Sequence, residues 1–332
     1  MRKLIFLSLL CVSLGACLII PVTSEEKIMQ PKPSRFSSVK SQCATHLANA
    51  SKLFDDILAV SDDRNEANTL VPFNEIHVEL SAASALSGLL SEVHPSKEIR
   101  DEAELCDQDL ERFSSELSLN KPLYEALASI DQKSLDSTAR RMLDKSLQDF
   151  KKSGVDKDDA TRAKIQSVEQ ELVLISQAFG RHIRDDVRYI EVKNLKGLPE
   201  DYVTSHPADA NGLIKITTDY PDYIPFMTYA DNAADRESLW RKFNARGYPA
   251  NKPVLQQLIQ KRHELAKLLG YKSYADYVVE DEMIRSTPKA ASFIDKIARI
   301  SKKSADKEYA FLLAEKAMIF INGFSVDSRQ CR

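Results

Sequence analysis

Apolar residues recur at helical spacing along the first half of the chain. From Val39 onward they fall every three or four residues, a period typical of a helix with one buried face. The same period continues through further segments up to about residue 187, separated by short polar or proline-containing breaks. Residues 39–187 are therefore predicted to form an N-terminal region of antiparallel helices.

Particular residues mark where these helices begin and end. Pro72 suits the first turn of a second helix, and Ser96 is a preferred N-cap for a third. Gly154 suits the left-handed position that closes a helix running from about residue 135 to residue 152. Asp156 is predicted to start the next long helix. These signals divide the region into helices that are joined by short connections.

The period of the pattern changes after residue 187. Residues 188–192 and 213–217 alternate in the manner of short β-strands, with a loop between them. Helical spacing resumes at Ile224 and continues in punctuated segments. Residues 188–316 are therefore predicted to hold a small two-stranded element followed by helices, and the fold class is mainly α.

The last residues lose the helical pattern. From about Ala317 an apolar-rich run extends to residue 326 and is followed by a short polar end. An apolar run of this kind needs a partner that covers it. Residues 317–332 are accordingly predicted to be an aberrant tail, produced by a gene truncation or a frameshift.

The first residues have the features of a targeting segment. Two basic residues precede an apolar stretch, and Leu14 to Cys17 matches the lipobox at which a bacterial lipoprotein signal is cleaved. Residues 1–17 are predicted to be this signal peptide, with Cys17 lipidated and residues 18–38 forming a flexible tether. Cleavage by the ordinary signal peptidase and an uncleaved anchor are the alternatives, since the apolar run continues toward Val22.

All three alternatives place the folded part outside the cytoplasm. Residue 18 is leucine rather than aspartate, which by analogy with bacterial sorting favours the outer membrane. The sequence thus predicts a lipid-anchored protein of the bacterial cell envelope that faces the periplasm. An oxidising periplasm would permit a disulfide between Cys43 and Cys106. The alternative is that each cysteine is a small buried apolar residue on a helix face.

Charged residues are abundant, and their signs are interspersed. The formal net charge is −3 over 332 residues, and no basic patch stands out. We therefore predict no nucleic-acid partner. The chain also has no CxxC pair and no serine or cysteine in the setting of a nucleophile elbow.

Four stretches of the chain resemble one family of peptidases in their order and spacing. They are residues 158–192, 195–203, 216–237 and 236–283. Through them the chain resembles the thimet oligopeptidase, neurolysin and dipeptidyl carboxypeptidase family of zinc metallopeptidases, from about Val39 to about Lys316. The resemblance implies a neurolysin-like helical lobe that faces a catalytic lobe across a deep channel, with short peptides as substrates.

Catalysis in that family requires an HExxH helix. Its two histidines lie one turn apart and bind zinc, its glutamate activates the bound water, and a downstream glutamate completes the metal site. The nearest segment here is His263-Glu264, where Lys267 stands in place of the second histidine. His77 and Glu79 are two residues apart and point to different sides of a helix. We predict no catalytic and no metal-binding residues in this chain, although zinc is expected in full-length family members.

Two other groups of residues have structural explanations. Residues 278–282 include three carboxylates near a predicted helix end, a pattern typical of a solvated face. Four aromatic residues, Tyr220, Tyr223, Phe226 and Tyr229, could stack against a peptide. Their spacing favours packing against a neighbouring helix.

Together these features predict the N-terminal portion of an extracytoplasmic, zinc-dependent oligopeptidase that hydrolyses short peptides. The chain is predicted to be truncated before the catalytic core and inactive by itself. The alternative, from another functional class, is a non-catalytic helical lipoprotein that binds peptides or a protein partner.

Overall fold

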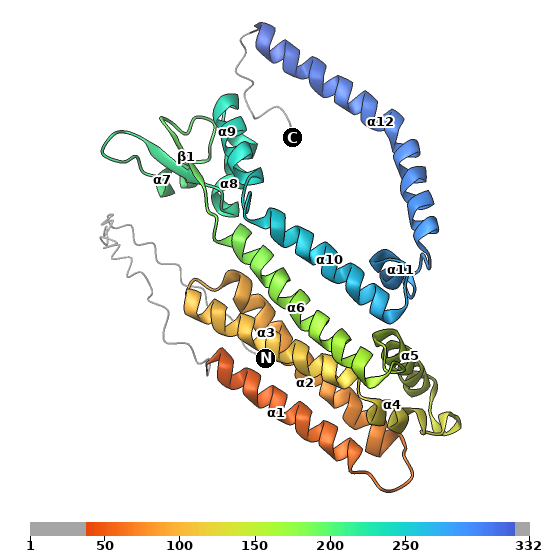
Figure 1. The fold of residues 1–332 in the computed structure, drawn as a ribbon. Coiled ribbons are helices and arrows are strands. Elements are labelled where there is room, and N and C mark those ends of the chain that lie inside the picture. The colour runs from red at the N-terminus through yellow and green to blue at the C-terminus, as the bar shows by residue number, and fades with distance from the viewer. Residues whose placement is uncertain (1–37, 323–332) are drawn as a thin grey trace, which may run out of the picture. The chain divides into compact units, whose positions relative to one another are not determined.

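The computed structural model describes residues 38–322, and side chains up to residue 318. The predicted signal peptide with Cys17, the tether up to residue 37 and the last ten residues of the predicted tail lie outside this range. Helices account for most of the described chain, and one two-stranded sheet accompanies them (Figure 1). The predicted mainly α fold with a small two-stranded element is confirmed. None of the helices within the described range is long and apolar enough to cross a membrane.

The elements follow one another along the chain without an internal repeat of their order. In order they are α1 (Val39–Leu58), a π-helical turn (Glu66–Leu70), α2 (Val71–Val93), α3 (Lys97–Ser118), α4 (Lys121–Ala128), a 3₁₀ turn (Gln132–Ser134), α5 (Ser137–Ser153), α6 (Asp159–Arg184), β1 (Tyr189–Val192), α7 (Glu200–Ser205), β2 (Ile214–Thr217), α8 (Tyr220–Tyr229), α9 (Ala233–Asn244), α10 (Asn251–Leu269), α11 (Tyr274–Val279) and α12 (Thr287–Asn322).

Helix termini follow the capping residues of the sequence, with one correction. The Ser96 side chain accepts a hydrogen bond from the Ile99 amide and caps α3, as predicted. Gly154 ends α5 in the left-handed conformation with φ of 96°, also as predicted. The predicted start of α6 at Asp156 is wrong, because Asp158 is the N-cap and accepts from the Thr161 amide.

Three short helical elements were missed by the sequence pattern, among them the 3₁₀ turn Gln132–Ser134. The π-helical turn before α2 is held by a reciprocal capping box between Asn65 and Asn68. Helix α7 lies inside the loop predicted between the strands, and Tyr202 on it is buried. All three elements are too short to show a hydrophobic period.

The two strands pair antiparallel and have a small core of their own. Ile190 lies opposite Ile216 in the register, and Tyr189 lies opposite Thr217. Ile190 and Ile216 pack with Phe226 of α8 and Leu239 of α9. This arrangement explains the alternating pattern of the strands, since only one face is buried.

Helices α1, α2 and α3 pack against one another, and a larger core lies among α1 to α5. Within this core a disulfide joins Cys43 of α1 to Cys106 of α3, with 5.9 Å between the Cα atoms. The structure therefore contains the bonded pair, rather than two separate buried thiols. The cross-link closes a loop with a sequence separation of 63 residues between α1 and α3.

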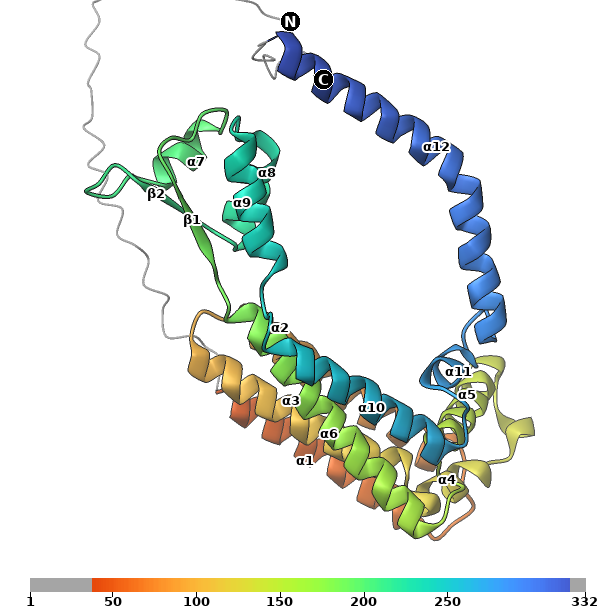
Figure 2. The same cartoon turned by 45° about the horizontal axis from the view of Figure 1, so that its top comes forward.

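Helix α6 lies between the first three helices and α10 (Figures 1 and 2). Glu104 of α3 is 5% exposed and receives hydrogen bonds from the guanidinium groups of Arg181 and Arg184 on α6. Arg184 also donates to the backbone carbonyl of Ser91 in α2, at 2.7 Å. A single buried carboxylate therefore connects α6 with α2 and α3.

Helix α12 has few contacts with the rest of the described chain. It contacts α11, and its large apolar side chains are exposed, among them Phe293, Ile297 and Phe311. The predicted change at residue 317 does not coincide with a helix end, because α12 continues to Asn322. The division of the chain at residues 187, 316 and 317 stays a prediction.

Replacing Glu104 by glutamine tests the buried ionic contact. The change keeps the shape but leaves two guanidinium groups facing a neutral partner in a buried site, which is expected to lower the free energy of unfolding by about 3 kcal/mol. Urea unfolding at pH 7 measures this difference. The matched control is Glu102→Gln, because Glu102 lies two residues before Glu104 on α3 and has no ion pair. Equal effects of the two substitutions would contradict the role given to Glu104.

Candidate functional site

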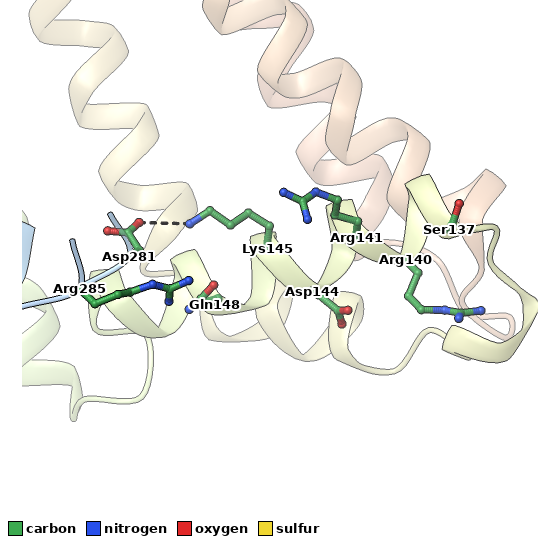
Figure 3. Close-up of a pocket in the computed structure, with 8 residues that line it drawn as sticks. All are labelled: Ser137, Arg140, Arg141, Asp144, Lys145, Gln148, Asp281 and Arg285. Carbon is green, nitrogen blue, oxygen red and sulfur yellow. Dashed lines mark hydrogen bonds and ion pairs between the residues drawn. The ribbon is translucent and has the colours of Figure 1, made fainter. Parts of the chain in front are cut away.

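The first candidate site is a groove along α5, hereafter the α5 groove. Its volume is about 610 Å³, and Figure 3 shows the side chains that line it. The lining residues are Ser137, Arg140, Arg141, Asp144, Lys145, Gln148, Asp281 and Arg285. The first six come from α5, where their spacing places them along one side of the helix, and the last two come from the segment between α11 and α12. Four cationic and two anionic side chains therefore meet in this groove.

Asp281 fixes the segment after α11 to α5. Its carboxylate receives the ammonium groups of Lys152 and, at 3.2 Å, of Lys145. The hydrogen bond from Lys152 is the main cause that lowers the pKa of Asp281 to about 2. Residues 278–282 were predicted to be a solvated acidic face, and for Asp281 this prediction is wrong, because the carboxylate is paired with lysines of a distant helix.

The second candidate site, hereafter the acidic pocket, lies among α2, α3, α6, α10 and α11. Its volume is about 590 Å³. Its titratable and charged lining residues are Asp107, Glu111, Glu169, Arg262, Tyr274 and Tyr277. Arg262 lies over the ring of Tyr274 at 5.3 Å, so the one cation of the described lining is stacked on an aromatic side chain.

Burial raises the pKa of each of the three carboxyl groups in the acidic pocket. Asp107 accepts a hydrogen bond from Ser87, and Glu169 accepts one from Ser115, which in each case opposes the effect of burial. The negative charge of Glu111 raises the pKa of Glu169 further. Burial also raises the pKa of Tyr277 to about 12. The carboxyl groups of the acidic pocket therefore stay protonated to a higher pH than they would in water.

The four aromatic residues of α8 have different surroundings. Phe226 is buried and Tyr223 stacks on Phe243 with 3.9 Å between ring centroids, so packing explains both. Tyr220 and Tyr229 are exposed. Tyr220 is 59% exposed and contacts the ring of Phe243 only edge-on. The prediction that all four residues pack against a neighbouring helix is therefore wrong for Tyr220 and for Tyr229.

The histidine segments considered from the sequence do not come together. His77 packs edge-on against Phe73, and burial lowers its pKa. Glu79 instead contacts His46 of α1 at 2.6 Å. His263 is exposed on α10, away from both.

Two family models match this chain in successive segments. The model of the neurolysin and thimet oligopeptidase N-terminal domain matches residues 51–162, and the model of peptidase family M3 matches residues 226–326. Over these two segments the chain resembles peptidase family M3. The second match passes the predicted boundary at residue 317 and ends within the predicted tail. The family resemblance found in the sequence is thereby confirmed and extends further toward the C-terminus than predicted.

Several curated relatives of the chain are named as oligopeptidases. Saccharolysin of Saccharomyces cerevisiae is 27% identical over 77% of this chain and 38% of its own length. The thimet-like oligopeptidase of Dictyostelium discoideum is 24% identical over 90% of this chain and 46% of its own. Oligopeptidase A of Haemophilus influenzae is 26% identical over 73% of this chain and 38% of its own length. The chain thus spans less than half the length of each of these relatives.

Members of peptidase family M3 are zinc metallopeptidases, which raises the question whether residues of this chain fit zinc. Structural zinc needs four ligands and catalytic zinc three protein ligands from histidine, cysteine or carboxylate side chains. Within residues 38–318 no three such side chains are grouped so that they could hold a metal ion. Lys267, at the place of a second histidine after His263, donates to the carbonyl of Lys272 at 2.9 Å. The described residues therefore do not fit zinc.

Glu169→Gln tests the electrostatics of the acidic pocket. The folded-state pKa of Glu169 is raised above 4.5, so the carboxyl group stabilises the fold below about pH 4.5 and this contribution is lost as the pH rises through the raised pKa. Glutamine can still accept from Ser115 and carries no charge. The variant is expected to be more stable than the parent at pH 7, by on the order of 1 kcal/mol, and to lose this advantage at pH 4.

Chemical unfolding at several pH values measures this difference. Glu116→Gln is the control, because Glu116 is exposed on the same helix as Glu111. A stability gain from Glu169→Gln that is the same at pH 4 and pH 7 would contradict the explanation by burial.

Proposed function

We propose that this chain is part of a zinc-dependent oligopeptidase that hydrolyses short peptides. The observation that carries the proposal is the pair of family matches, which occur in chain order and fall on separate helical segments. In the proposed enzyme, the described helices form a wall of the peptide-binding channel. The zinc ligands would come from an HExxH helix and a further glutamate outside the described residues.

The packing of α3, α6 and α10 supports the role of a wall. The three helices pack in succession, with α6 in the middle and tied to α3 by the buried Glu104 contact. Leu265 and Leu269 of α10 form an apolar cluster with Ile165 and Val168 of α6. A wall of this kind holds its surface side chains in fixed positions, which lowers the ordering cost of binding a flexible peptide.

The full chain of 332 residues is expected to leave peptides intact, because the residues from 38 to 318 offer no set of zinc ligands. An internally quenched short peptide, incubated with the purified chain and zinc, measures cleavage. Turnover that a chelator abolishes and that zinc restores would contradict this expectation. The genomic DNA downstream, translated in three frames, is expected to encode an HExxH segment.

The alternative function is a non-catalytic helical protein that binds peptides or a protein partner. It is favoured by the exposed apolar side chains along α12, such as Phe293, Ile297 and Phe311, which suit a covering partner. The downstream DNA separates the two functions. A clean absence of an HExxH segment in every frame would favour the alternative and contradict the peptidase proposal.

We further propose that the protein is exported and lipid-anchored at Cys17, in the outer membrane of a bacterial envelope and facing the periplasm. The disulfide between Cys43 and Cys106 supports an oxidising compartment, since such bonds are rare where thiols are kept reduced. The lipobox that ends at Cys17 supports the anchor.

Alkylation of intact cells followed by mass spectrometry tests this location. Cys43 and Cys106 are expected to react after reduction and not before, and the mature protein is expected to begin at a lipid-modified Cys17. Cys17→Ala should lose the lipid and leave the disulfide unchanged. Free thiols at Cys43 and Cys106 in untreated cells would contradict an oxidising location, and an unmodified residue 17 would contradict the lipid anchor.

A further inference from the structure

The α5 groove carries more positive than negative charge on a chain whose net charge is negative. Four lining side chains are cationic and two are carboxylates, whereas the whole chain has a formal charge of −3. The groove is also open to solvent, since Arg141, Lys145, Gln148 and Arg285 are all exposed. An excess of positive charge at an accessible concave surface attracts anions.

Both carboxylates of the groove and one of its cations, Lys145, already have partners. Asp281 binds Lys145 and Lys152, while Lys145 also binds Asp149 at 2.9 Å. Asp144 accepts from the side-chain amide of Gln132 at 3.1 Å. Asp281 is therefore paired with lysines, whereas Asp144 keeps its charge because its partner is a neutral amide.

Arg140 uses its guanidinium group to support the turn before α5. Its Nε donates to the carbonyl of Gln132 at 3.1 Å, and one Nη donates to the carbonyl of Leu135 at 3.0 Å. Arg140 therefore has a structural role. The guanidinium groups of Arg141 and Arg285 differ from it, because neither has a hydrogen-bonding or ion-pairing partner within residues 38–318.

The backbone of Arg285 adds a second, independent observation. Arg285 has a φ of 63°, and no other non-glycine residue of the described chain has a positive φ. The left-handed conformation is unfavourable for a residue with a side chain and is normally filled by glycine. Figure 3 shows the Arg285 side chain extending along the groove on the side of Gln148. An arginine at such a position is explained if its side chain is required there.

We propose that the α5 groove binds an oxyanion, a carboxylate or a phosphate group, through Arg141 and Arg285. A guanidinium group presents paired N–H donors whose geometry matches two oxygens of either group. Gln148, on the side along which Arg285 extends, lies in the same lining and offers a neutral donor (Figure 3). The oxyanion has two sources, the acidic side chain of a peptide and free inorganic phosphate.

Titration calorimetry of the full chain with matched probes tests the proposal and identifies the source. The probes are inorganic phosphate, a blocked tetrapeptide with two glutamates, and the same peptide with glutamines. Binding of phosphate or of the glutamate peptide, and not of the glutamine peptide, is the expected result. Because the groove is exposed, the affinity should also fall as salt is added. Absence of binding by both anionic probes at low salt would overturn the proposal.

Three variants make the assignment specific to the two arginines. Arg141→Gln and Arg285→Gln are each expected to weaken binding at least about tenfold, as expected for loss of a charge-assisted hydrogen bond. Arg285→Gly should lose the same affinity while melting no lower than the parent, because glycine suits a φ of 63°. The control is Arg112→Gln, which removes the same charge from an exposed arginine that pairs with Asp109 on α3. If Arg112→Gln weakened anion binding equally, the loss of net charge alone would explain the weakening. This result would overturn the assignment to Arg141 and Arg285.

These measurements are independent of the proposed peptidase activity. They record binding by the chain as it is, without zinc and without cleavage of a peptide. Failure of the oxyanion proposal would therefore leave the peptidase proposal intact. Failure of the peptidase proposal would leave the result for the α5 groove unchanged.

Discussion

The position of α6 depends on one buried carboxylate. The side chain of Glu104 is 6% exposed, and a charge so far from water is tolerated only when it is paired and hydrogen-bonded. Arg181 and Arg184 supply those partners from successive turns of α6, and Arg184 extends the contact to the backbone of α2. Since α10 packs on α6 and α11 follows α10, the placement of both candidate sites depends on this contact.

Much of the fold could be predicted from the sequence because its signals are local. Ser96 and Gly154 act within one helical turn, and the alternation of the two strands follows from one buried face. The start of α6 was misplaced because Asp156 and Asp158 are both good N-caps, and the choice between them depends on packing. Helix α7 was missed because six residues are too few to display a period.

The candidate sites could be predicted much less well, because each joins segments that are distant in sequence. Asp281 looked like part of a solvated acidic run, yet its partners Lys145 and Lys152 lie on α5, more than a hundred residues earlier. Glu111 and Glu169 each look like ordinary helix-surface residues in the sequence. Their raised pKa values result from burial between packed helices, which no local pattern encodes.

The segment from α11 to the start of α12 links the two sites, which have opposite charge. Tyr274 and Tyr277 line the acidic pocket, and Asp281 and Arg285 line the α5 groove. Lys152 contacts both ends of this segment, because its ammonium group lies 5.0 Å from the ring centroid of Tyr277 and also pairs with Asp281. An oxyanion bound beside Arg285 would compete with Asp281 for Lys145 and so loosen one of the two lysine contacts of this segment. Burial is the main cause that raises the pKa of Tyr277 and the charge of Asp281 adds to it, so a changed contact of Asp281 would affect the acidic pocket through this tyrosine.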